Sequence, residues 1–239
     1  MTGRVFRAAC CGICIHFAVQ MASASVLVEY NFSGLPGDQI TTPASWTATG
    51  LTATAIRRGP GLEALAGAGL MNSRAWAMGE IDRDFDYFEW TIVPASGVTL
   101  NLEEIAFGER RNATGIRTFA LRSSLDGFAR DAVAPVEVPD DGELRNHVLA
   151  LGSAFDAISS PVTFRLYGYL SEAFIGRWGI TNHQEAGAFR ISGTASGLES
   201  EPTGGDAGGA QAPEPAAGII WSIVVAIAVG GSAFRRWRG

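Results

Sequence analysis

The chain contains no lysine, and its three cysteines all lie within the first fifteen residues. Because no cysteine follows Cys14, no disulfide can cross-link the rest of the chain, which must be stabilised by burial of its own core. All 18 basic residues are arginines, and five of them lie near the two ends, so residues 25–212 carry 13 arginines against 23 acidic residues. This acidity argues against nucleic acid as a partner, since binding to phosphates requires a basic surface.

Residue patterns of catalytic sites are also scarce. After residue 24 the chain has two histidines, His147 and His183, and neither a Gly-x-Ser-x-Gly nor a His-Glu-x-x-His sequence. The usual parts of a hydrolase triad and of a catalytic zinc site are therefore missing. Glu103 and Glu104 are adjacent, and adjacent strand residues face opposite sides, so they are not expected to share a glycosidase cleft. We predict that the protein is not an enzyme and has no catalytic residues and no resident cofactor.

Residues 1–24 have the composition of a secretory signal peptide. Arg4 and Arg7 precede an apolar run that is too short to span a bilayer comfortably. Ala22 and Ala24 are small residues at the two positions that signal peptidase recognises, which predicts cleavage after Ala24. No lipoprotein motif precedes the cysteines, so they are interpreted as apolar residues of the signal rather than as lipidation sites.

The last 27 residues combine three features in a fixed order. Pro213, Glu214 and Pro215 precede the stretch 216–234, which has no charged residue and is long enough to cross a bilayer as a helix. Arg235 and Arg236 follow directly. Arginines on this side predict a transmembrane helix with its C-terminal end in the cytoplasm and the preceding chain outside. The alternative, a buried core helix, is disfavoured by the unbroken hydrophobicity.

This order of Pro-Glu-Pro, apolar helix and arginine cluster resembles the PEP-CTERM sorting signal of exported bacterial proteins. The resemblance implies that an exosortase, a membrane-embedded cysteine protease or transpeptidase, recognises Pro213, Glu214 and Pro215 and removes the helix. It also implies that the domain is held in the inner membrane only for a time, and is then released or transferred to the cell surface or to the exopolysaccharide matrix. Signal peptidase and exosortase are thus the predicted processing partners.

Residues 25–192 show the periodicity of β-strands. Short β-branched and aromatic runs alternate with Gly, Pro, Asn and Asp, and residues 87–93 and 162–170 alternate in polarity as central strands do. We predict an all-β fold, an antiparallel two-sheet sandwich of jelly-roll type, with a flexible Gly/Ala/acidic linker at 193–212 and helices only in the two terminal signals. The predicted strands are 26–32, 51–57, 87–93, 98–102, 105–110, 118–123, 133–138, 147–151, 162–170, 174–180 and 188–193.

Three aspartates are candidates for binding a cation. Asp82, Asp84 and Asp86 stand at alternate positions, the spacing with which an EF-hand calcium loop begins. Such a loop needs glycine at its sixth position and glutamate at its twelfth, where this chain has Tyr87 and Val93. The preferred interpretation is an acidic turn that leads into a strand, and a calcium site is the alternative.

Two tryptophans are candidates for contact with a sugar. Trp46 and Trp76 lie in loop-like surroundings and are predicted to be exposed, and a flat aromatic ring complements the face of a sugar. Arg57-Arg58 and Arg110-Arg111 are expected to be surface charges paired with carboxylates. The leading prediction is a structural or adhesive protein of the cell surface or exopolysaccharide matrix. The alternative is an extracellular carbohydrate-binding module, and a polysaccharide hydrolase is a third, less favoured hypothesis.

Overall fold

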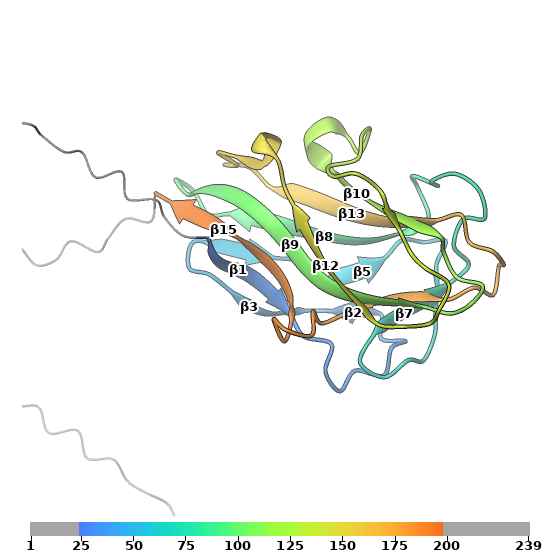
Figure 1. Cartoon of the computed structure of the whole chain (residues 1–239). Helices are drawn as coiled ribbons and strands as arrows, with labels where there is room; N and C mark the ends of the chain where they lie inside the picture. The colour runs from blue at the N-terminus through green and yellow to red at the C-terminus, as the bar shows by residue number, and fades with distance from the viewer. Residues whose placement is uncertain (1–23, 198–239) are drawn as a thin grey trace, which may run out of the picture. The chain divides into compact units, whose positions relative to one another are not determined.

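The computed structural model describes residues 24–197, which form an all-β structure of two antiparallel sheets with almost no helix (Figure 1). The expected two-sheet architecture is therefore confirmed. Within this range no helix is long and apolar enough to cross a membrane. Most of the predicted signal peptide and the whole predicted sorting signal, 213–239, lie outside the described residues. The elements are β1 (Ser25–Tyr30), β2 (Thr41–Thr42), β3 (Ala44–Thr47), β4 (Leu51–Ala53), β5 (Ile56–Arg58), β6 (Glu63–Ala64), β7 (Met71–Arg74), β8 (Tyr87–Pro94), β9 (Thr99–Arg111), β10 (Thr118–Ser123), η1 (Ser124–Asp126), β11 (Val136–Glu137), β12 (Arg145–Ala150), η2 (Ser153–Phe155), β13 (Val162–Tyr169), β14 (Trp178–Thr181) and β15 (Phe189–Ser196).

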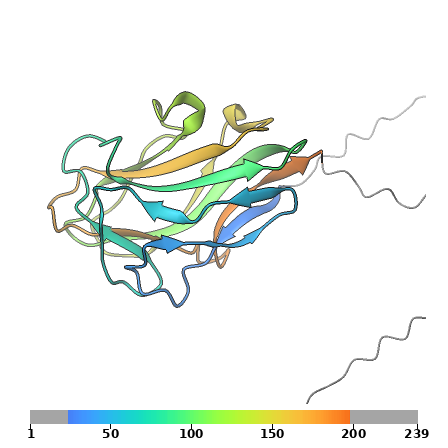
Figure 2. The ribbon, with the colours of Figure 1, turned by 180° about the vertical axis from the view of Figure 1, so that it is seen from behind.

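The two sheets pack face to face. Sheet A has the order β3-β1-β15-β9-β14-β7-β6, with β12 also paired to β9, and sheet B has the order β11-β10-β13-β8-β5-β2, with β4 also paired to β8. In Figure 1 strands β9, β12 and β15 lie toward the viewer, and Figure 2, from behind, brings β8 and β13 forward. Aromatic rings fill the space between the sheets: Phe107 lies 5.7 Å from Phe119, and Trp90 lies 5.2 Å from Phe189, between ring centroids. This core stabilises the domain without a disulfide.

Strand β9 replaces two predicted strands, 98–102 and 105–110. It continues through the predicted break because a register shift between Ser192 and Gly193 of β15 absorbs the extra residue as a bulge. Gly193 permits this close approach, since a Cβ there would lie 2.0 Å from the carbonyl oxygen of Asn101. β15 then continues to Ser196, so the domain boundary expected at residue 192 lies inside the last strand.

Two other predicted strands are mostly loop. Of 133–138 only Val136 and Glu137 form a strand, and of 174–180 only the part from Trp178 onward does. Phe174 and Ile175, which suggested a strand by their residue type, are 56% and 63% exposed. Their loop bonds to neighbouring loops rather than to a sheet, with Ala75 N–H donating to the Phe174 carbonyl oxygen at 3.1 Å.

The described chain enters and leaves the domain at one end. Ser25, the first residue of β1, pairs with Gly193 of β15. β9 runs the length of the sandwich, from Thr99 beside Ser196 to Arg111 beside Trp178. The loops 75–86, 112–117 and 170–177 therefore lie at the opposite end, which we call the loop end (right in Figure 1).

Candidate functional site

The outer face of sheet A carries a row of side chains that crosses five strands. Trp46 of β3 pairs with Glu29 of β1, and Glu29 pairs with Arg190 of β15. Arg190 pairs with Ala106 of β9, which pairs with Val148 of β12. Directly paired residues point to the same side of a sheet, so these five, here called the Trp46 row, lie side by side. At about 4.8 Å between neighbouring strands, the row is about 19 Å long.

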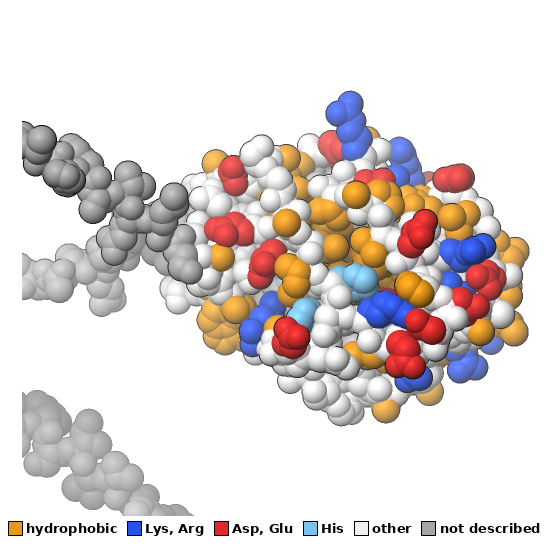
Figure 3. Space-filling model, viewed as in Figure 1, with side chains coloured by type: hydrophobic (Ala, Val, Ile, Leu, Met, Phe, Trp, Pro, Cys, Tyr) orange, Lys and Arg blue, Asp and Glu red, His pale blue; other side chains and the backbone are white. Residues whose placement is uncertain are grey.

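A turn borders the Trp46 row on the side of the loop end. Gly108 is the next residue of β9 on this face, and a Cβ there would lie 2.4 Å from the carbonyl oxygen of Asn182, so the turn after β14 covers it. Gln184 N–H donates to Asn146 Oδ1 at 2.9 Å, which ties the turn to β12. The two ends of the row are exposed, Trp46 at 47% and Val148 at 56%, whereas Ala106 between Arg190 and Val148 is buried at 5%. In Figure 3 hydrophobic and basic side chains lie together at the lower left, over β1 and β3.

An ion pair occupies the middle of the Trp46 row. Arg190 Nε donates to Glu29 Oε1 at 2.7 Å, and the two side chains are 34% and 25% exposed. Within residues 24–197 the other guanidinium nitrogens of Arg190 and Oε2 of Glu29 have no hydrogen-bond partner. The pair therefore offers free donors and a free acceptor to a ligand while carrying no net charge.

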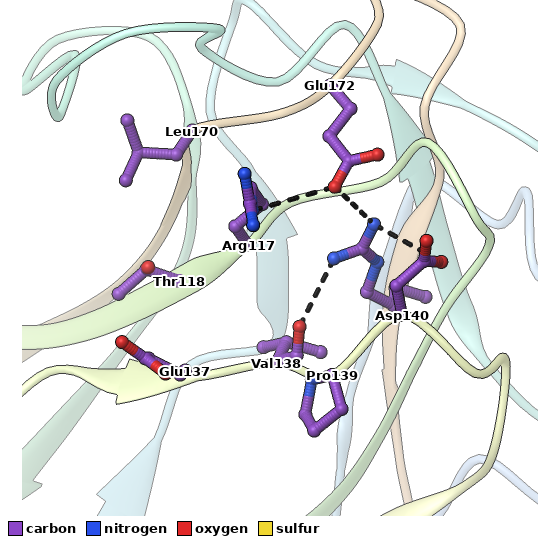
Figure 4. A pocket seen from close by; sticks show the side chains of 9 residues that line it. Arg117, Thr118, Glu137, Val138, Pro139, Asp140, Leu170 and Glu172 are labelled. Carbon is purple, nitrogen blue, oxygen red and sulfur yellow. Dashed lines mark hydrogen bonds and ion pairs between the residues drawn. The ribbon is translucent and has the colours of Figure 1, made fainter.

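A cavity of about 490 Å³ lies at the loop end, between β10, β11 and the loop after β13 (Figure 4). Its base is formed by Arg111, whose side chain is 1% exposed and lies 3.2 Å from Glu172 and 3.6 Å from Asp140. Arg117, 67% exposed, reaches the same Glu172 at 3.6 Å. The cations of this cavity thus already have carboxylate partners.

Arg111 acts as a tie between loops. It also donates to the carbonyl oxygens of Asn112, Ala113 and Val138, so each of its three nitrogens has a partner. The expectation that Arg111 is a surface charge is wrong, because its stem and head group fill the space under these loops. Arg58 differs from the expectation as well: it is partly buried, and two of its partners are the carbonyl oxygens of Gly37 and Asn72.

The outer face of sheet B carries a row of charged residues that neutralise one another. Glu89 lies between Arg57 and Arg165, with Nε–Oε distances of 2.9 and 2.7 Å. Burial acts to raise the pKa of Glu89, but the hydrogen bonds and charges of both arginines outweigh it and hold that pKa below its ordinary value. The rings of Tyr87 and Phe128 each lie 4.1 Å from the Arg165 guanidinium. This row is a closed network with little left for a ligand.

The three aspartates of the calcium hypothesis are not brought together. Asp82 accepts a hydrogen bond from the backbone N–H of Asp84 at 3.1 Å, as in an acidic turn. Asp86 is buried, and burial together with the charge of Asp82 raises the pKa of Asp86 to about 6, although a hydrogen bond from the Ala77 N–H lowers it. Throughout the described part of the chain, no three acidic, histidine or cysteine side chains group as metal ligands.

The two candidate tryptophans differ in position. Trp46 is exposed on the face of sheet A, whereas Trp76 is 1% exposed, so the prediction that Trp76 lies at the surface is wrong. Although it follows β7 outside any strand, its ring turns inward against Phe88 and Trp178, at 5.3 and 5.1 Å between centroids. Gly168 of β13 leaves room for it, since a Cβ there would lie 2.8 Å from the Trp76 ring.

The histidines do not form an accessible site with a carboxylate. His147 Nε2 lies 3.5 Å from Glu109 Oε1, but Glu109 is 0% exposed and accepts a hydrogen bond from the Trp178 indole. His183 is buried in the turn after β14, where its Nδ1 accepts from the Ala186 N–H at 3.3 Å. Both histidines therefore serve local structure.

No protein-family model matches the chain, and no curated protein matches it. Among solved structures, the chain is similar to the K1 cleaved adhesin domain of Lys-gingipain (Kgp) from Porphyromonas gingivalis W83. The sequence identity is 15% and the TM-score 0.35, over 74% of this chain and 100% of that one. A similarity of this degree establishes neither a common family nor a common function.

Proposed function

We propose that the chain is an exported protein of the cell surface or exopolysaccharide matrix, with a structural or adhesive β-sandwich that is not an enzyme, and that an exosortase cleaves its C-terminal signal. One observation carries the proposal: the two ends of the described domain lie on the paired strands β1 and β15. An export signal before β1 and a membrane segment after β15 would both be attached at this end. The loop end, at the other pole, and the outer faces then stay free for contacts outside the cell.

The position of the predicted signal cleavage supports export. Cleavage after Ala24 leaves Ser25 as the first residue of the mature chain, and Ser25 is the first residue of β1. The cut would therefore remove nothing from the sandwich. After export, the helix at 216–234 would hold the chain in the inner membrane, with Arg235 and Arg236 in the cytoplasm, until the exosortase acts at Pro213, Glu214 and Pro215.

A second candidate function, an extracellular carbohydrate-binding module, is favoured by the exposure of Trp46. Its ring lies on the open face of a sheet, 47% exposed, beside charged groups that have free hydrogen-bonding atoms. Exopolysaccharide would then be the partner, and binding would be the way in which the domain adheres to the matrix.

The intact mass of the mature protein tests the processing. In a bacterial host that has an exosortase, we expect a product that begins at Ser25 and lacks residues 216–239, whereas a host without the enzyme retains them. Glu214→Ala together with Pro215→Ala should leave the C-terminal segment in place, while Pro202→Ala, a proline outside the tripeptide, should be processed normally. Retention of residues 216–239 in the exosortase host would show that the sorting hypothesis is wrong.

A further inference from the structure

We propose that the Trp46 row binds a neutral polysaccharide, whose chain runs across the strands of sheet A. The inference rests on the second candidate function above and gives it a site and a ligand class. It is carried by the exposed ring, by the ion pair next to it, and by the turn that borders the row.

Trp46 is the exception among the tryptophans of the described residues. Trp76, Trp90 and Trp178 are each at most 1% exposed, whereas Trp46 is 47% exposed. An exposed tryptophan forgoes part of the stabilisation that full burial of a large apolar side chain would give. It lies in a strand rather than in a loop, and the pairing of β3 with β1 sets the place of its backbone on the sheet. A flat ring exposed on this face can stack on the C–H face of a pyranose.

The Glu29–Arg190 pair supplies hydrogen bonds at the next positions along the row. Arg190 stands two strands from Trp46, about 10 Å away at strand spacing, so a sugar stacked on Trp46 places its neighbours in the chain over the pair. Free guanidinium N–H groups and a free carboxylate oxygen lie side by side there. This combination suits vicinal hydroxyls, which donate and accept at once.

The turn after β14 favours a polysaccharide chain that runs across the strands. It covers Gly108 and bonds to the exposed Asn146, so it borders one side of the strip that runs across the strands from Trp46 to Val148; within this strip Ala106 is buried, 5% exposed. The strip is about 19 Å long, which suits several linked sugars rather than one.

Charge favours a neutral ligand over an acidic one. The ion pair at the centre of the row has no net charge, and residues 24–197 contain 20 acidic residues against 13 arginines. A polyuronate would approach a domain of its own sign and would be repelled. A neutral chain avoids this cost and still uses both the ring and the pair.

Affinity electrophoresis tests the proposal with residues 25–197, which form the two-sheet domain. The gels contain a β-glucan, a glucomannan, a galactan, a xylan or alginate. We expect at least one neutral polysaccharide to retard the protein and alginate to leave it unaffected. Retardation by alginate alone, or by none of the five, would overturn the proposal. If the C-terminus is nevertheless processed as expected, these results contradict the sugar site and leave the sorting hypothesis standing.

Substitutions place the binding on the row. Trp46→Ala should weaken binding to the retarding polysaccharide roughly tenfold or more, as removal of a central tryptophan does at many interfaces. Arg190→Gln should weaken it less. Phe174→Ala is the matched control, because Phe174 is an aromatic residue of similar exposure, 56%, at the loop end. A Trp46→Ala protein with an unchanged melting temperature and unchanged affinity would contradict the assignment.

Discussion

Two buried tryptophans show how a single hydrogen bond separates residues that look alike in sequence. Trp178 and Trp90 are both at most 1% exposed and both lie in central strands. The indole N–H of Trp178 donates to Glu109 Oε2 at 2.8 Å, whereas the indole nitrogen of Trp90 has no partner among the described residues. Glu109 is fully buried and depends on such partners, because an unpaired buried carboxylate is costly.

The change of each tryptophan to phenylalanine should therefore have unequal effects. Trp178→Phe loses ring volume and leaves Glu109 without its closest donor, while Trp90→Phe loses ring volume but also removes an N–H group that has no partner. We expect Trp178→Phe to lower the free energy of unfolding by about 1–3 kcal/mol more than Trp90→Phe does. Urea unfolding, followed by circular dichroism, measures both. Equal losses would mean that the bond to Glu109 contributes nothing.

At the scale of elements, the alternation of polar and apolar residues predicts a strand well where one face of the sheet is buried and the other is exposed. Residues 87–93 and 162–170 are the central strands β8 and β13, as predicted. The prediction of a strand at 174–180 is wrong for the first half of this run, because that half forms hydrogen bonds with other loops. The alternation of residue types contains no information about such partners. The prediction that Trp76 is exposed is wrong for the same reason, since the space that its ring occupies is left by Gly168 of another strand.

The candidate site was predictable only in part. Trp46 stands out in the sequence by its residue type, but the prediction of loop-like surroundings is wrong, because it lies in strand β3. Glu29 and Arg190 do not, because they are 161 residues apart and meet only through the pairing of β1 with β15. The position of Glu29 between apolar neighbours predicts that its side chain lies on the outer face of the sheet. No local pattern predicts that its partner is Arg190.

Backbone bonds join three loops at the loop end, and one glycine makes their approach possible. Ser171 N–H donates to the Ala77 carbonyl oxygen at 2.9 Å, and Ala173 N–H donates to that of Thr114 at 3.2 Å. At Gly176 a Cβ would lie 1.9 Å from the Thr114 carbonyl oxygen, a backbone atom that has no rotamer by which to move away. The contact between loops 112–117 and 170–177 therefore requires glycine at this position.

Gly176→Ala should for this reason push the two loops apart and lower the free energy of unfolding by about 1–3 kcal/mol. Gly79→Ala is the matched control in an adjoining loop, because nothing lies within 4 Å of a Cβ at Gly79. We expect that variant to stay within about 0.5 kcal/mol of the unchanged protein. Chemical denaturation measures both, and a Gly176→Ala variant as stable as Gly79→Ala would show that the loops can rearrange freely.

At the scale of the whole molecule, the arrangement of the strands should allow the ends of the domain to be joined and new ends to be opened elsewhere. β1 and β15 are antiparallel neighbours, so a short connection from Gly197 to Ser25 would turn them into an ordinary hairpin. A new opening can be placed between Ser33 and Gly34, in the exposed loop after β1, where nothing lies within 4 Å of a Cβ at Gly34. Neither change breaks a strand pairing of the two sheets.

A circular permutant that begins at Gly34 and joins Gly197 to Ser25 through about five glycine and serine residues should therefore fold to the same structure. We expect its melting temperature to lie within a few degrees of that of residues 25–197, and its binding to the retarding polysaccharide to be unchanged, because Glu29 and Arg190 would then face each other within one hairpin. A permutant that is unfolded would contradict the adjacency of the two ends. One that folds but no longer binds would instead place the ligand away from the Trp46 row, because the row keeps its strand pairings in the permutant and only the joined ends and the opened 33–34 loop have changed.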